Sequence, residues 1–302
     1  MKQFEGRVAV ITGAASGLGR EFANTAAALG MKLVLADVDA AGLERATDEL
    51  QLGGAEVLSM VVDVRKSAHV AELADAAMIR FHGVHLVFNN AGVGAGGLIW
   101  ENSEADWEWV LGVNLWGVIH GVRVFTRIML ECARHDPGYE GHIVNTASMA
   151  GLLNAPAMGV YNVSKHAVVS LTETLHHDLR LVDAPIGASV LCPYFVPTGI
   201  DRSDRRRPHE LQHESAPTAS QLAAQALVSK AVEAGKVPAA EVARITFEAI
   251  REGRFYIYSH PQALGSVAER MQAVVQGAPP SDPYAATPQI SQMLKARLKG
   301  QG

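Results

Sequence analysis

The stretch Arg7-Val8-Ala9-Val10-Ile11-Thr12-Gly13-Ala14-Ala15-Ser16-Gly17-Leu18-Gly19 decides the fold, because one glycine-rich turn joins two kinds of local structure. Its first half is a β-branched run of the kind that fits a strand buried on both faces. From Leu18 to Leu29 the apolar residues have helical spacing, and Gly30 stands where such a helix would end. We therefore expect a strand, a tight turn and a helix in immediate succession.

The same alternation continues along the chain as far as residue 192. Further strands are expected at 33–36, 57–62, 84–88, 142–147 and 186–192, and helices at 43–50, 67–82, 104–134 and 160–182. Strands separated by helix-length segments need crossover connections, which make them parallel and put helices on both faces of the sheet. The sequence therefore predicts one doubly wound, Rossmann-like α/β domain.

The rest of the chain departs from this rhythm. Residues 199–222 are polar, charged and proline-containing, and a segment of that length is more typical of a lid than of a connection. Helical patterns return at 218–234 and 238–252, residues 255–258 predict a last strand, and the apolar spacing from 290 to 298 predicts a short amphipathic helix. We expect one domain over residues 1–276, which includes the 199–222 substrate loop, and a C-terminal extension over 277–302.

The composition describes a globular protein without a strong charge field. Apolar residues make up 48% of the chain and the net charge is −5, so nothing favours nucleic acid or an anionic membrane as a partner. The first residues lack a signal-peptide pattern, and no apolar run reaches the ~18 residues of a membrane span. Cys132 and Cys192 lie in separate elements, and the histidines lack partners at ligand spacing. We expect a cytoplasmic protein without a metal site.

Tyr161 and Lys165 stand four residues apart at the head of the expected 160–182 helix, so their side chains share one face. A phenol titrates near ~10, and a neighbouring ammonium favours the phenolate and lowers that pKa. The pair predicts an acid/base site, although the same spacing alone is common on exposed helices. Ser148 ends an apolar, strand-like run thirteen residues before Tyr161, and Asn114 lies in the long helical region.

Taken together and in order, these motifs resemble the short-chain dehydrogenase/reductase family of the standard, single-domain type, over roughly residues 5–260. The resemblance implies the strand order 3-2-1-4-5-6-7 and a nicotinamide cofactor. It implies that Tyr161 is the general acid/base and that Lys165 tunes it and binds ribose. Ser148 would hold the substrate oxygen, and Asn114 would hold a water that completes a proton relay.

The glycine turn would hold the cofactor pyrophosphate, because glycines let backbone N–H groups approach it at a helix N-terminus. The resemblance places the cofactor contacts at Gly13, Ser16, Gly17, Leu18, Gly19, Asp37, Asp63, Val64, Asn90, Ala91, Gly92, Tyr161, Lys165, Pro193, Val196 and Thr198. Asp37 can accept hydrogen bonds from the ribose hydroxyls and repel a 2′-phosphate. No lysine or arginine stands near Asp37 or in the glycine turn, so NAD is the expected cofactor.

One position departs from the family pattern, because Tyr194 follows Pro193 where the family usually has glycine. The residues expected around the reacting carbon are apolar or aromatic: Met149, Leu152, Leu153, Met158, Tyr194 and Phe195. We therefore expect a bulky hydrophobic or cyclic substrate, capped by the 199–222 loop.

These patterns predict an NAD-dependent oxidoreductase that interconverts a secondary alcohol and a ketone. By resemblance, the long helices would pair two subunits, which implies a homodimer or homotetramer. A nucleotide-sugar epimerase or dehydratase of the extended type shares Tyr-x-x-x-Lys, but its glycine pattern and large C-terminal domain differ. A non-catalytic, dinucleotide-sensing regulator is the alternative outside the enzymes. Such a regulator could have discarded the acid/base residues that this chain retains.

Overall fold

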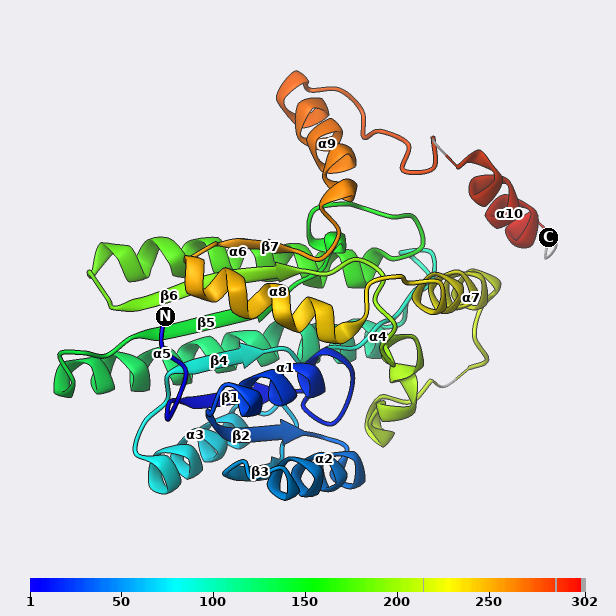
Figure 1. The fold of residues 1–302 in the computed structure, drawn as a ribbon. Helices are drawn as coiled ribbons and strands as arrows, with labels where there is room; N and C mark the ends of the chain where they lie inside the picture. The colour runs from blue at the N-terminus through cyan, green and yellow to red at the C-terminus, as the bar shows by residue number, and fades with distance from the viewer. Residues whose placement is uncertain (214, 286, 300–302) are drawn as a thin grey trace.

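A seven-stranded parallel sheet runs through the middle of the protein (Figure 1). The computed structural model describes residues 1–213, 215–285 and 287–299. The strands are β1 (Val8–Thr12), β2 (Lys32–Asp37), β3 (Val57–Val61), β4 (Leu86–Asn89), β5 (Gly141–Thr146), β6 (Ile186–Cys192) and β7 (Tyr256–Tyr258). Their order, 3-2-1-4-5-6-7, confirms the predicted doubly wound topology.

Successive strand residues point into two different apolar layers. On one face Ile11 and Leu35 pack with α1 (Gly17–Ala28), α2 (Ala40–Leu52) and α8 (Ala239–Glu252). On the other face Val10 and Val34 pack with α3 (Ser67–Phe81), α5 (Gly117–His135) and α6 (Gly159–Leu181). Because both faces are covered, the central strands carry continuous apolar runs.

Three aromatic rings fix the first helix against the sheet. The rings of Phe22 on α1 and Phe88 on β4 stack with centroids 4.4 Å apart, and Phe247 on α8 lies 5.5 Å from Phe88. Phe22 and Phe88 are fully buried, and truncating a buried phenylalanine typically costs ~3–5 kcal/mol. This packing holds the N-terminus of α1 directly after the glycine turn.

The long helical region predicted at 104–134 is divided into three parts. α4 (Glu104–Leu111) begins with a capping box on Ser103 and leads into a π-helical turn, η1 (Gly112–Trp116), before α5. Such π turns insert one extra residue per turn and are frequent at functional sites. The turn carries Asn114, which is completely buried.

The segment 199–222, expected as a substrate loop, contains short helical turns before α7. Two short 3₁₀ helices, η3 (Ile200–Arg206) and η4 (His209–Leu211), precede α7 (Ala219–Glu233), whose capping box begins at Thr218. Short 3₁₀ turns show no apolar periodicity, which is why the sequence did not indicate them. Glu214 of this segment lies outside the described residues.

The C-terminal part forms an arm that extends from the body of the molecule (Figure 1). α9 (Leu264–Gln276), which was not predicted, projects away from the sheet, and the chain then returns to α10 (Pro288–Lys299) beside α7. No residue of α9 is fully buried, so the helix does not form part of the core. Residues 286 and 300–302 of the predicted extension lie outside the described residues.

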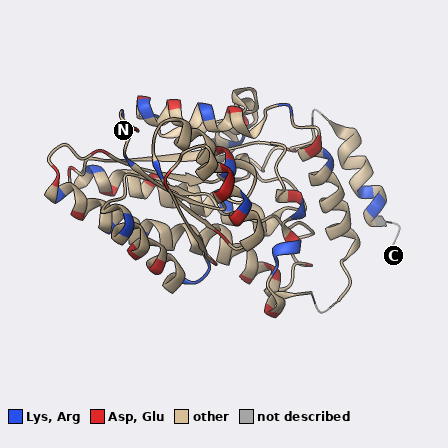
Figure 2. Ribbon diagram, turned by 60° about the horizontal axis from the view of Figure 1, so that its bottom comes forward, with Lys and Arg blue, Asp and Glu red and all other residues tan. Residues whose placement is uncertain are grey.

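Charged residues of both signs are interspersed over the helices, as Figure 2 shows. No helix within the described residues is long and apolar enough to span a bilayer.

Candidate active site

A cavity of about 1040 Å³ follows the carboxyl ends of the strands. This volume lies at the upper end of the usual ligand-pocket range of ~300–1,000 Å³. Of the predicted site residues it is lined by Gly13, Ser16, Gly17, Leu18, Asp37, Asp63, Val64, Asn90, Ala91, Gly92, Ser148, Tyr161, Lys165, Pro193, Val196 and Thr198. Gly19 and Asn114 lie outside this wall.

The glycines of the turn expose the backbone to the cavity, and the turn has little space for side chains at these positions. Gly13 and Gly17 have positive φ angles of 69° and 56°. A Cβ on Gly19 would lie 2.1 Å from the carbonyl oxygen of Gly13, so Gly19 supports the turn from beneath. The turn therefore presents peptide groups, rather than side chains, at the N-terminus of α1.

Thr12, which the sequence did not single out, joins the turn after β1 to the turn after β4. Its hydroxyl accepts hydrogen bonds from the backbone N–H groups of Asn90 (2.9 Å) and Ala91 (3.1 Å), and donates to the carbonyl of Phe88 (3.2 Å). The Asn90 amide donates back to the Thr12 carbonyl at 3.0 Å. These bonds fix two walls of the cavity relative to each other.

Asp37 lies at the end of β2 with its carboxylate directed into the cavity. Its two oxygens accept hydrogen bonds from the backbone N–H groups of Ala15 and Asp39, each at 2.9 Å. Burial raises the pKa of Asp37, while these hydrogen bonds and the charge of Arg206 act in the opposite direction. Each oxygen keeps a further lone pair for a ligand hydroxyl.

The expectation that no cation lies near Asp37 was wrong. Arg206 on η3 forms an ion pair with Asp39, and both residues line the cavity beside Asp37. Arg206 and Asp39 are 167 residues apart in the chain, so only the folded protein brings them together.

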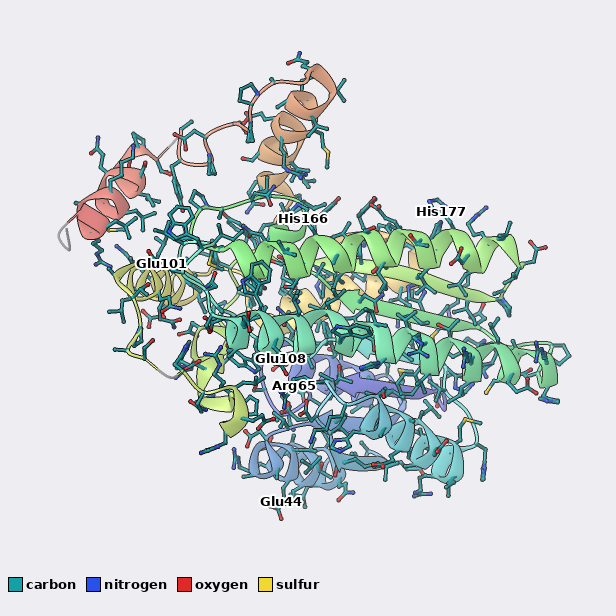
Figure 3. The ribbon with its side chains drawn as sticks, turned by 180° about the vertical axis from the view of Figure 1, so that it is seen from behind. Glu44, Arg65, Glu101, Glu108, His166 and His177 are labelled. Carbon is teal, nitrogen blue, oxygen red and sulfur yellow. The ribbon has the colours of Figure 1, made fainter. Side chains whose placement is uncertain are left out.

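Asp63, after β3, is held by an arginine that the sequence also missed. Arg65 donates from Nε to both Asp63 oxygens (3.0 and 3.1 Å) and from Nη2 to Oδ2 (2.7 Å). Although burial acts in the opposite direction, these bonds lower the pKa of Asp63. Arg65 also packs against Gly112 at the beginning of η1, between α2 and the longer helices (Figure 3).

Tyr161, Lys165 and Ser148 converge in the middle of the cavity. The Lys165 ammonium donates to the carbonyl of Thr146 at 2.9 Å and lies 5.7 Å from the centre of the Tyr161 ring. The Ser148 hydroxyl donates to the carbonyl of Pro193 at 3.3 Å and accepts from the Ala150 N–H at 3.1 Å. The ends of β5 and β6 and the start of α6 thus position an amine, a hydroxyl and a phenol together.

The pKa of Tyr161 departs from the expected direction. Burial raises it to about 12, and the neighbouring Ser148 hydroxyl offsets only part of that effect. Burial also lowers the pKa of Lys165 to about 8. The direction of the Tyr161 shift is opposite to the predicted lowering of the phenol pKa, because desolvation of the phenolate is the largest cause of the shift and the Lys165 ammonium lies 5.7 Å from the ring centre.

Asn114 lies behind the cavity wall. Its side-chain oxygen accepts from the Val93 N–H at 2.8 Å, and its amide donates to the Val93 carbonyl (2.9 Å) and to the Ser164 hydroxyl (3.1 Å). A Cβ on Gly92 would lie 3.5 Å from both Asn114 Oδ1 and Lys165 Nζ. Asn114 therefore fixes the segment that separates it from Lys165.

The other half of the cavity is apolar. Of the predicted substrate-side residues, Met149, Leu153, Met158, Tyr194 and Phe195 line it, whereas Leu152 is buried behind them. The Tyr194 ring packs on Phe195, with centroids 4.6 Å apart, and remains 45% exposed. The sequence did not predict the outer wall of this half. It is formed by α7 and by the arm, that is, by α9, the chain between α9 and α10, and α10; the residues are Leu227, Val228, Val274, Tyr284, Ile290 and Leu294.

The arm closes this apolar half from outside. His166 on α6 lies below the base of α9 (Figure 3), and the charge of Arg270 on α9 contributes, after burial, to lowering the pKa of His166. Among the described residues no three His, Cys, Asp or Glu side chains are grouped to hold a metal.

This fold and this site define a dinucleotide-binding oxidoreductase. Residues 7–209 match the family model described as short chain dehydrogenase. A CLA biosynthesis dehydrogenase/reductase of Lactiplantibacillus plantarum is 35% identical over 92% of this chain and 97% of its own. A short-chain dehydrogenase/reductase from Burkholderia phymatum, solved in complex with NAD, is 56% identical with a TM-score of 0.91, covering 94% of this chain and 99% of its own. The chain belongs to the short-chain dehydrogenase/reductase family.

A third relative, the 1-deoxy-11-beta-hydroxypentalenate dehydrogenase of Streptomyces avermitilis, is 32% identical over 88% of this chain and 89% of its own. Three similar chains of known structure are described in complex with NAD, NADH and NADP, respectively.

The burial of Lys165 predicts a pH-dependent stability effect. Lowering its pKa from 10.5 to about 8 corresponds to a folding cost on the order of 3 kcal/mol at pH 7. Lys165→Met removes this cost but leaves the Thr146 carbonyl without its partner, which costs ~1 kcal/mol. We expect urea unfolding at pH 7 to show the variant more stable by about 1–2 kcal/mol.

This advantage should shrink as pH rises from 8 to 10.5, because the unfolded lysine then loses its proton too. Lys230→Met, on the exposed side of α7, serves as the control and should show no such trend. Equal effects of Lys165→Met at pH 7 and at pH 10 would contradict the assignment.

Proposed function

We propose that the protein is an NAD-dependent oxidoreductase that interconverts a secondary alcohol and a ketone on a bulky hydrophobic or cyclic substrate. The observation that carries the proposal is the meeting of Tyr161, Lys165 and Ser148 between the glycine turn and the apolar half of one cavity. The fold and family alone would not distinguish this reaction from others that use the same cofactor.

The residues of the cavity fit a nicotinamide dinucleotide. The glycine turn offers backbone N–H groups to a pyrophosphate, and added Cβ atoms would crowd Ala91 at Gly13 and Thr198 at Gly17. Asp37 would bind the adenosine ribose, and Asp63 with Val64 would contact adenine. Asn90, Ala91 and Gly92 would line the ribose, and Pro193, Val196 and Thr198 the nicotinamide end.

The bound cofactor would accept or donate the hydride, and the protein handles the proton. In the direction of reduction, Tyr161 would donate its phenol proton to the ketone oxygen while the Ser148 hydroxyl holds that oxygen. In the direction of oxidation, Tyr161 would take the hydroxyl proton. Lys165 would stabilise the phenolate form, whose pKa of about 12 makes the protonated phenol the resting state. Asn114 would hold a water that links Lys165 to solvent.

We also propose a lid, a C-terminal cover, an oligomeric state and a cellular compartment for the enzyme. We place a lid at residues 199–222 and treat 277–302 as an extension that closes the substrate side. Half-exposed Trp116, at the end of η1 directly before α5, and Val163 on α6 support subunit contact through these helices in a homodimer or homotetramer. The two free cysteines support a reducing, cytoplasmic setting.

Turnover with a panel of alcohols and ketones tests the reaction and separates the enzyme from a cofactor-sensing regulator. Tyr161→Phe should lower kcat by about 10²-fold or more, because the transferable proton is lost, with NADH affinity retained. Lys230→Met is the matched control and should keep wild-type kcat. Near-normal turnover by Tyr161→Phe would exclude the assigned role, and cofactor binding without turnover of any substrate would favour the regulator.

The shape of the cavity predicts the order of substrates in that panel. Bulky or cyclic ketones should have a kcat/KM about tenfold or more above that of short, charged ones, because each buried methylene contributes ~0.8 kcal/mol. Deleting residues 278–302 should raise KM for the bulky ketones while NADH affinity stays constant. A preference for short charged ketones, or an unchanged KM after deletion, would contradict this substrate class.

Asp37 predicts the choice between NAD and NADP. A carboxylate at the ribose repels a 2′-phosphate, so we expect kcat/KM with NAD to exceed that with NADP by about 10²-fold. Asp37→Ala should reduce this preference by at least about tenfold. Asp48→Ala, on the outer surface of α2, is the control. Equal use of both cofactors by the wild type, or an unchanged ratio in Asp37→Ala, would remove Asp37 as the selector.

A further inference from the structure

The segment of η3 and η4 is tied to three sides of the cofactor groove. The side chain of Arg207 is completely buried, pairs with Asp106 on α4 and lies 4.7 Å over the Trp109 ring. Glu210 contacts Arg65 at 3.1 Å, which is itself bound to Asp63 after β3. These contacts anchor the segment that directly follows Arg206.

Arg206 extends from this anchored segment to the end of β2. Its guanidinium pairs with Asp39, and its charge also acts on Asp37, two residues earlier. Its side chain is 38% exposed, so it reaches the groove from the solvent side and can change partners without disturbing the core. Arg206, Asp39 and Asp37 all line the same cavity.

The other cations of this region are placed differently. Arg65 is occupied by Asp63 and Glu210. Arg205 also lines the cavity, but its guanidinium lies 3.6 Å from the Cβ position of Gly199, next to Thr198, which contacts Gly17. Arg205 therefore faces the pyrophosphate end, and Arg206 is the cation at the ribose end among the described residues.

We propose that Arg206 is a second residue that determines specificity at the adenosine ribose. It is positioned by the η3–η4 segment, and its ion pair with Asp39 keeps it from other partners until a 2′-phosphate binds. The inference rests on the proposed function, in which a nicotinamide dinucleotide occupies this groove. With NAD, Arg206 stays paired with Asp39 and closes the outer side of the ribose site. With NADP, Arg206 leaves Asp39 and pairs with the 2′-phosphate, which a guanidinium binds more strongly.

This arrangement makes cofactor choice a balance between two groups. The Asp37 carboxylate repels the 2′-phosphate and so weakens the binding of NADP. Arg206 reduces this loss of affinity by pairing with the phosphate, and Asp39 competes with the phosphate for the same guanidinium. The protein therefore tolerates NADP more than Asp37 alone would allow, and Asp39 sets how much more.

Direct titration of NADH and NADPH, followed by nicotinamide fluorescence, tests the proposal without any substrate. Arg206→Gln should raise the Kd of NADPH about tenfold and that of NADH no more than about threefold, because only the phosphate loses a charged partner. Asp39→Asn should lower the Kd of NADPH about tenfold by releasing Arg206. Asp39→Asn combined with Arg206→Gln should lose that gain.

Arg202→Gln is the matched control, because Arg202 lies on the same 3₁₀ helix, outside the cavity lining, with a side chain 66% exposed. It removes one charge and should leave the ratio of the two Kd values unchanged. The NADPH effect of Arg206→Gln should also shrink at ~1 M salt, where the screening length is only ~3 Å.

Two results would overturn the inference. If the wild type binds both nucleotides and neither Arg206→Gln nor Asp39→Asn shifts the NADPH to NADH ratio by more than about twofold, Arg206 is not a specificity residue. In that case the proposed function stands. If the wild type binds neither nucleotide, the proposed function and the inference both fail.

Discussion

Parallel pairing of β1 with β2 on one side and with β4 on the other is the constraint on which the rest of the structure depends. It aligns the carboxyl ends of the central strands at one edge, so that Gly13 after β1, Asp37 at the end of β2 and Asn90 after β4 line one groove. The Thr12 hydroxyl bonds then lock the turns after β1 and β4 together. The other residues of the site are arranged around this edge of the sheet.

Burial, more than charge pairing, controls the chemistry of the site. Lys165 and Tyr161 lie in a region that disfavours their charged forms, which brings the lysine pKa down toward neutrality and raises that of the phenol. A site of this kind is unstable in isolation, and it persists because the β5 carbonyl of Thr146 and the packed core behind α6 hold the ammonium in place. Catalytic sites commonly carry such a cost.

The groove is completed by segments that follow β6, the sixth strand. The segment from η3 to η4 borders the side of the cavity proposed for the cofactor through ion pairs, whereas α7, the chain between α9 and α10, and α10 line the other side with apolar residues. The two borders of the cavity therefore differ in their response to salt. Salt weakens exposed ion pairs, while apolar burial persists, so the cofactor side is the more sensitive to ionic strength.

The sequence by itself determined the sheet, its strand order through the family resemblance, and the identity of the residues along the groove. Those features depend on local periodicity and on motifs of fixed spacing, which can be read without coordinates. Only the tertiary structure decided that Arg206 reaches Asp39, that α9 and the arm cover the apolar half, and that burial raises the pKa of Tyr161. Ion pairs between distant residues, helices without buried residues, and desolvation all depend on what surrounds a side chain in space, and no pattern along the chain records that.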